Sequence, residues 1–178
     1  MKLIILNGTS GSGKTTVAKQ LHQILPLSVM IPNYEIRRMI SGFADYREES
    51  REIMFNIIYG IVEQALFSNV DVIVDSKIHD DCTGNSFVDR LVALGVEKAA
   101  VTYEIILQVD KQQSMDRIRT RGFKPGAILS EDNLEENVDT FLAKMDEYTK
   151  SRKDSILVDT SHLSPEQVLD EIKSIIVA

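Results

Sequence analysis

The apolar residues of this chain form two kinds of segment, short unbroken runs and helical stripes. The unbroken runs have the length of strands whose two faces are both buried, as in a parallel sheet. They predict strands at Lys2–Leu6, Val70–Val74, Val101–Val109 and Ser155–Val158, with a shorter extended segment at Ser28–Ile31.

The segments between these runs repeat their apolar residues with the period of an α-helix. The first stripe follows the first strand and comprises Val17, Ala18, Leu21, Ile24 and Leu25. Four more helices are predicted at Glu48–Phe67, Gly84–Leu94, Asp110–Arg119 and Glu131–Tyr148. We expect Gly95 to end the second of these four helices, because glycine commonly terminates helices. The last helix begins at Ser164, with a capping box and a proline at its first position.

Regular alternation of strands and helices predicts an α/β fold, in which helices cover both faces of a parallel sheet. The sequence has no internal repeat and no linker-like tract, so one domain is expected over residues 1–178. Ligands of such sheets bind at the carboxyl ends of the strands, where functional residues should therefore be sought.

The strongest chemical signal directly follows the first strand. Residues 8–15 read GTSGSGKT and match the phosphate-loop (P-loop) pattern G-x-x-x-x-G-K-[ST], between a predicted strand and a predicted helix. Small residues let backbone amides converge on phosphate oxygens, and the helix N-terminus adds positive potential. Lys14 would reach the β- and γ-phosphates, and Thr15 would bind Mg²⁺. The predicted phosphate-binding residues are Gly8, Thr9, Ser10, Gly11, Ser12, Gly13, Lys14, Thr15 and Thr16.

The second signal is an acid, Asp75, which directly follows the predicted strand Val70–Val74. An acid at the carboxyl end of such a strand commonly holds Mg²⁺ directly or through water. We therefore predict Thr15 and Asp75 as the metal site. A turn or helix-capping role for Asp75 is the alternative.

Residues 117–124 read RIRTRGFK and carry four cations without an acid, in a chain that is otherwise acidic. Arg117 and Arg121 are four residues apart and would share one helix face. Guanidinium groups there could stabilise the charge on a phosphoryl group in transfer. The alternative is a solvated helix end. Glycine and proline follow, which suits a small arginine-rich lid over about residues 119–130.

Charge and composition exclude several classes of protein. Twenty Lys and Arg against 27 Asp and Glu give a net charge of −7, which argues against a general nucleic-acid or membrane-surface binder. Cys82 is the single cysteine, so no disulfide can form within the chain. No apolar stretch approaches the ~20 residues of a membrane span. We expect a soluble, cytoplasmic protein.

The P-loop, the arginine-rich segment and Val158–Ser161 before the capped last helix together resemble the small P-loop kinases. These include shikimate, gluconate and nucleoside monophosphate kinases, and the resemblance is strongest to chloramphenicol phosphotransferase and its zeta-toxin-like relatives. The resemblance implies a three-layer P-loop NTPase fold with a five-stranded parallel sheet and helices on both faces. It also implies ATP and Mg²⁺ as cofactors and phosphorylation of a small molecule's hydroxyl. It also implies that adenine lies between Arg117 and the loop at Asp159 and Thr160.

In that family a carboxylate just after the second strand acts as the base toward the acceptor hydroxyl. The matching segment is Ile31–Glu35, so the resemblance gives this role to Glu35. The chain departs from the family in using Glu where Asp is usual, and in following Asp75 with Ser76 rather than a second acid. Asp75 is the other candidate for the base, and the sequence leaves the choice open. The polar residues at 79–81 could line the acceptor pocket.

These observations favour an ATP-dependent phosphotransferase that acts on a small alcohol, either antibiotic-like or a metabolite. A nucleoside or nucleotide kinase is the first alternative, in which Arg37 and Arg38 would bind a second phosphate. An ATP-binding regulatory module without transfer is the alternative from another class. The sequence indicates neither the acceptor nor the oligomeric state.

Overall fold

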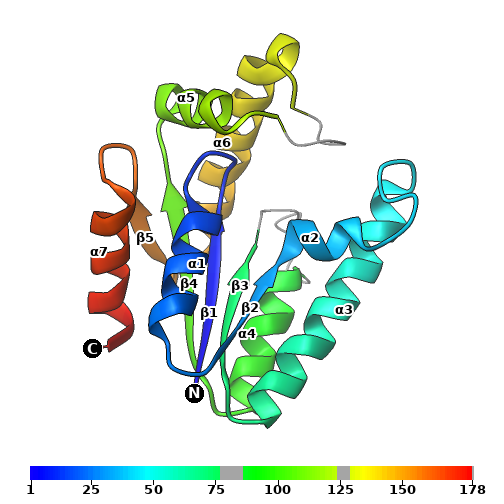
Figure 1. The fold of residues 1–178 in the computed structure, drawn as a ribbon, viewed down its shortest axis with the longest axis vertical. Coiled ribbons are helices and arrows are strands. Elements are labelled where there is room, and N and C mark those ends of the chain that lie inside the picture. Colours follow the sequence, from blue (N-terminus) through cyan, green and yellow to red (C-terminus); the bar gives the residue numbers. More distant parts are fainter. Residues whose placement is uncertain (77–85, 124–128, 178) are drawn as a thin grey trace.

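The computed structural model describes residues 1–76, 86–123 and 129–177 (Figure 1). Its centre is a sheet of five strands in the order β2-β3-β1-β4-β5, and every neighbouring pair is parallel. The strands are β1 (Lys2–Gly8), β2 (Ser28–Pro32), β3 (Asp71–Asp75), β4 (Val101–Gln108) and β5 (Ile156–Asp159). The predicted five-stranded parallel sheet is therefore confirmed.

Seven α-helices lie in the described part of the chain. They are α1 (Lys14–Ile24), α2 (Asn33–Arg38), α3 (Arg47–Phe67), α4 (Phe87–Glu97), α5 (Lys111–Arg121), α6 (Leu134–Ser151) and α7 (Pro165–Val177). A turn of 3₁₀-helix, Glu131–Asn133, precedes α6, where the sequence predicted continuous α-helix. The capping box at the start of α7 is confirmed, since the side chains of Ser164 and Gln167 bond to each other's backbone amides. The short helix α2 was not predicted.

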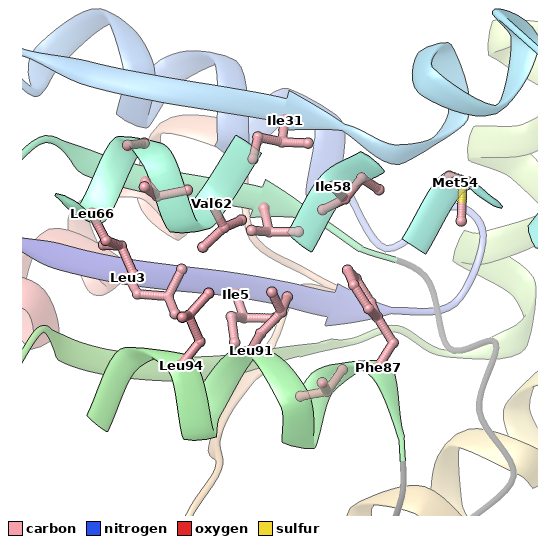
Figure 2. Close-up of a cluster of buried hydrophobic side chains, with 14 residues drawn as sticks. Leu3, Ile5, Ile31, Met54, Ile58, Val62, Leu66, Phe87, Leu91 and Leu94 are labelled. Atoms are coloured by element: carbon pink, nitrogen blue, oxygen red, sulfur yellow. The ribbon is translucent and has the colours of Figure 1, made fainter. Parts of the chain in front are cut away.

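Helices cover both faces of the sheet. On one face α3 and α4 pack on β1, β2 and β3 through a buried cluster that includes Leu3, Ile58 and Leu91 (Figure 2). On the other face α1 and α7 pack on the sheet around Ile4, Leu6 and Ile172. The alternation of Leu3 and Ile4 between the two clusters reflects the period of two in a strand. The layered α/β architecture follows directly from this double burial.

The predicted end of α4 at Gly95 is wrong. The helix continues through Gly95 to Glu97. A Cβ at this position would lie 2.2 Å from Thr102 Oγ1 and 3.2 Å from Leu3 Cδ2, so glycine is required here for close packing of α4 on the sheet. The predicted start of this helix, at Gly84, lies outside the described residues.

The P-loop follows the central strand, with β3 on one side of β1 and β4 on the other. The connection after β1 runs to β2 at one edge of the sheet, and the connection after β4 runs to β5 at the other edge. Ligands are therefore expected at the carboxyl ends of β1 and β4, which are neighbours. In Figure 1 the P-loop, α2 and α5 all lie at this end of the sheet. None of the described helices is long and apolar enough to cross a membrane.

Candidate functional site

The P-loop has a backbone shape that only glycine can supply at several positions. Gly8 and Gly11 have φ values of +145° and +80°. A Cβ would lie 2.5 Å from Leu107 O at Gly8, and 2.7 Å from Ser114 O at Gly11. The loop is thus packed tightly between β4 and α5. This packing fixes the curvature that directs its amides inward.

Helix α1 begins at Lys14, so the amides of its first turn lie outside the helical hydrogen-bond pattern. Gly13 precedes it in the left-handed conformation. Thr16 lies exposed in this first turn, while Lys14 is buried and its Nζ donates to Thr9 O at 2.6 Å and to Ser12 Oγ at 3.3 Å. A cation and a helix N-terminus therefore lie together at the loop, which is the chemistry of a polyphosphate site.

Thr15 and Asp75, the two residues predicted to bind the metal, are in direct contact. Thr15 Oγ1 donates to Asp75 Oδ2 at 2.6 Å, across 60 positions of sequence. A hydroxyl and a carboxylate oxygen are the hard donors that Mg²⁺ takes from protein, the rest of its coordination coming from phosphate and water. The two side chains therefore fit a magnesium ion.

Arg117 lies where the P-loop meets the loop after β5. Its guanidinium donates to Gly11 O at 3.2 Å, to Thr160 Oγ1 at 3.1 Å and to Thr160 O at 2.6 Å. Thr160 is buried and its hydroxyl donates to Ser12 O or Gln108 O. The structure thus brings together the two sides of the predicted adenine site. These bonds orient Arg117 across the loops.

Ser114 contacts the P-loop, and the sequence did not predict this role. Its hydroxyl donates to Ser10 O at 2.8 Å, and its backbone lies against Gly11. Together with Arg117, one turn further along α5, it binds this helix to the P-loop. The signal in the sequence was only a serine three residues before an arginine, on a helix whose partner was not known.

Asp159 shapes the loop that carries Thr160. Its carboxylate accepts hydrogen bonds from Ser161 Oγ at 2.6 Å and from Ser161 N at 2.9 Å, and these bonds hold the pKa of Asp159 below its usual range. Ser161 Oγ also accepts from the amide of Asp110, the residue that caps α5. Asp159 thus links the loop after β5 to the start of α5.

The predicted lid is described only at its two ends. Arg121 ends α5, is exposed and has no hydrogen bond or ion pair with any residue that the structure describes. Arg119 instead pairs with Glu131 at 2.9 Å. Residues 124–128, with Lys124 and Pro125, lie outside the described residues, as do the polar residues 79–81 that were expected near the acceptor and Cys82.

Of the two predicted bases, Glu35 lies on the outer side of α2. Its side chain is 58% exposed, and a carboxylate oxygen lies 3.6 Å from Arg38. The residue that directly follows β2 is instead Asn33, which is buried and whose Nδ2 donates to Ser76 Oγ at 3.5 Å. Asn33 was missed because the family pattern directs attention to an acid. A polar residue directly after an apolar strand is the signal that could have found it.

Arg37 stabilises the turn between α2 and α3. One of its terminal nitrogens donates to Arg47 O at 3.1 Å, and weaker contacts reach Phe43 O and Ser50 Oγ at 3.5 Å. Burial, with the charges of Arg47 and Arg51, lowers the pKa of Arg37. These contacts fold the guanidinium onto protein groups rather than present it to a second phosphate.

A half-buried ionic network links the end of α6 to β4 and α4. Arg152 binds Glu104 at 2.8 Å and also bonds to Asp89, while Tyr148 Oη donates to Glu104 at 2.7 Å. Burial, followed by the bond to Glu104, raises the pKa of Tyr148, which keeps its hydroxyl protonated. Asp89 in turn accepts from Ser86, the N-cap of α4. The network ties the helix after the β3 loop to β4.

The family described as "AAA domain" matches residues 3–148, which is most of the chain and includes the P-loop, Asp75 and Arg117. A comparison with curated proteins found no match.

Several solved structures share the whole fold. A tunicamycin resistance protein from Deinococcus radiodurans is 18% identical, with a TM-score of 0.68 over 99% of this chain and 96% of that one. Shikimate kinase from Acinetobacter baumannii is 19% identical, with a TM-score of 0.65 over 99% and 93%. Deoxyadenosine kinase from M. mycoides is 15% identical, with a TM-score of 0.55 over 98% of both chains. At such identities the likeness concerns the fold, which is that of the small P-loop kinases. The family match over residues 3–148 shows that this chain belongs to the AAA domain family.

Proposed function

We propose that the protein is an ATP-dependent phosphotransferase that moves the γ-phosphoryl group of ATP to a hydroxyl of a small molecule. The acceptor class that we favour is an antibiotic-like or metabolite alcohol. The observation that carries the proposal is the contact between Thr15 Oγ1 and Asp75 Oδ2, 2.6 Å apart beside the P-loop. It places a hydroxyl and a carboxylate together beside the lysine of a phosphate site, as phosphoryl transfer requires.

In this proposal the amides from Gly8 to Thr16 bind the phosphates. Lys14 would leave its bond to Thr9 O for the β- and γ-phosphates, a movement within the reach of its side chain. Thr15 and Asp75 would hold Mg²⁺, which when bound neutralises charge on the β- and γ-phosphates. Positioning and electrostatic stabilisation then account for most of the rate.

The two arginines take different parts. Arg117 is held by Gly11 and Thr160, and this supports a role in fixing the adenine side of the site. Arg121 lies exposed at the end of α5 and without a partner in the described part of the chain, so it is the cation that can move to the phosphoryl group. An arginine in that role can contribute ~10³–10⁵ in rate.

The geometry of the two acids supports only one of their predicted roles. Asp75 is in contact with Thr15, which favours a metal ligand over a base. Glu35 is exposed and paired with Arg38, so its position gives no support to a role as base. The nucleotide-kinase alternative loses support in the same region, because Arg37 is bound to the turn before α3.

The test is transfer of labelled γ-phosphate from ATP to a panel of alcohols. We would include shikimate, tunicamycin, deoxyadenosine and simple sugars, since the structural neighbours include proteins named for such compounds. The proposal predicts a magnesium-dependent, labelled phosphate ester of at least one compound. A deoxyadenosine product would favour the nucleoside-kinase alternative.

The matched variants are Lys14→Ala and Lys19→Ala. Both remove a lysine from α1, but Lys19 lies exposed one turn further from the P-loop. We expect loss of transfer by orders of magnitude in Lys14→Ala and wild-type transfer in Lys19→Ala. ATP binding with no transfer to any member of the panel would favour the regulatory module instead.

A further inference from the structure

Asn33 is a buried amide with an unused hydrogen-bonding atom. It is the first residue of α2 and only 4% exposed. Its amide nitrogen, Nδ2, donates to Ser76 Oγ at 3.5 Å. Its amide oxygen, Oδ1, has no hydrogen-bond partner among the described residues. A buried polar atom without a partner is rare in folded proteins and usually marks a site where a ligand or water completes it.

This amide belongs to a continuous row of polar groups along the carboxyl edge of the sheet. Pro32, directly before it, is in register with Asp75 of β3. Ser76 follows Asp75, is 2% exposed, and its amide donates to Leu6 O on β1. The row thus runs from Thr15 through Asp75 and Ser76 to Asn33, away from the adenine side of the P-loop. In an in-line transfer the acceptor approaches from the side opposite to the leaving nucleotide.

We infer that Asn33 orients the acceptor, its amide oxygen accepting the hydrogen bond of the hydroxyl that is phosphorylated. The inference rests on the proposed function and adds to it a residue for the acceptor side. It also implies that residue 33 does not take up the proton, because a neutral amide cannot act as a general base near neutral pH.

The step balances without a base at this position. The acceptor oxygen forms its bond to the γ-phosphorus while the bond from that phosphorus to the oxygen of the leaving ADP breaks. The hydroxyl proton passes to an oxygen of the transferred phosphoryl group and then to water, so one proton is released per ester formed. Because the transition state is loose, little charge builds up on the hydroxyl before transfer. Orientation of the hydroxyl is then what residue 33 supplies.

A purely structural role for Asn33 makes a different prediction. If its side chain serves only to attach α2 to Ser76, its removal would lower the melting temperature and leave the kinetic constants of the folded fraction unchanged. The orienting role predicts a change in the acceptor constants. The substitution Asn33→Asp keeps the shape of the side chain and adds a group that titrates.

The experiment measures kcat and KM for ATP and for the panel alcohol on which the wild type is most active. The variants are Asn33→Ala and Asn33→Asp, with Asn137→Ala and Asn137→Asp on α6 as controls, where the amide bonds to Asn133 O. We expect Asn33→Ala to lower kcat/KM for the alcohol about tenfold or more, the effect of one buried hydrogen bond, with KM for ATP unchanged. Asn33→Asp should remain active and acquire a pH profile whose rate rises as the new carboxyl group ionises, a limb absent from the wild type and the controls.

Several results would overturn the inference. Unchanged kcat/KM for the alcohol in Asn33→Ala would exclude the orienting role, as would an Asn33→Asp enzyme whose pH profile matches that of the wild type. If Asn33→Ala unfolds, the pH profile of the isosteric Asp variant decides alone. A wild type that phosphorylates no alcohol refutes the proposed function, whereas an active wild type with an indifferent residue 33 refutes only this inference.

Discussion

The packing of α5 against the P-loop can be tested with one methyl group. In Gly11→Ala the new Cβ would lie 2.7 Å from Ser114 O and 2.9 Å from Ser114 Cα, and the residue would keep a φ of +80°. In Gly13→Ala the residue also keeps a positive φ, +93°, but nothing lies within 4 Å of the new Cβ. The two variants therefore share the backbone strain and differ in the clash.

The expected losses of stability follow from these geometries. The left-handed conformation costs a non-glycine residue about 1–2 kcal/mol. Overpacking against backbone atoms, which cannot rotate away, adds about 1–3 kcal/mol. We therefore expect Gly11→Ala to lower the free energy of unfolding by about 2–5 kcal/mol and Gly13→Ala by about 1–2 kcal/mol.

The assay is equilibrium unfolding in urea without nucleotide, so that binding does not contribute to stability. Gly11→Ala should also weaken ATP binding, because separating α5 from the loop moves Arg117 away from Gly11 O. Equal losses of stability in the two variants would refute the description of the loop as packed against α5.

Three further predictions concern the framework around the site. Gly95→Ala should lower the free energy of unfolding, because its Cβ would meet Thr102 Oγ1 at 2.2 Å. Gly60→Ala, whose Cβ would have nothing within 4 Å, should raise this free energy by about 0.5–1 kcal/mol. Equal changes of stability in the two variants, measured by urea unfolding, would contradict this. Arg152→Met should cost about 3–5 kcal/mol, since it leaves the largely buried carboxylate of Glu104 and the half-buried one of Asp89 without their cation. A loss below about 1 kcal/mol in the same assay would show that the network is solvated. Burial raises the pKa of Asp89, but hydrogen bonds, first of all the one from Arg152, outweigh burial and hold this pKa below its usual range. The ionised Asp89 therefore stabilises the fold above its unfolded pKa of about 3.9, and this stabilisation is lost as the pH falls through the lowered folded pKa. Thermal unfolding from pH 2 to 7 should therefore show a shallower acid loss in Asp89→Asn, and parallel curves would contradict it.

The strands and the P-loop could be predicted from the sequence because each rests on a local requirement. A strand buried on both faces needs an unbroken apolar run, and β1 and β3 have one. The loop needs glycine at Gly8 and Gly11, where neighbouring backbone leaves no room for a Cβ. Asp75 was predicted because it ends a strand.

The features that the sequence did not predict depend on partners far along the chain. The end of α4 depends on Thr102, since Gly95 reads as a helix stop until the close approach of β4 is known. Helix α2 has only six residues and no apolar stripe to reveal it. Because α2 begins at Asn33, this residue lies at the edge of the sheet, whereas Glu35 lies two positions further along the helix.

The proposed function requires the P-loop, with Lys14, Thr15 and Asp75, to bind a nucleoside triphosphate together with magnesium. Calorimetric titration of the purified protein with a non-hydrolysable ATP analogue, with and without Mg²⁺, tests it most directly. We expect Mg²⁺ to strengthen binding of the analogue to the wild type. Asp75→Asn should make the binding insensitive to Mg²⁺, and Lys14→Ala should weaken it in both conditions. A wild-type protein that binds no triphosphate, or binds it equally well without Mg²⁺, would contradict the proposed function.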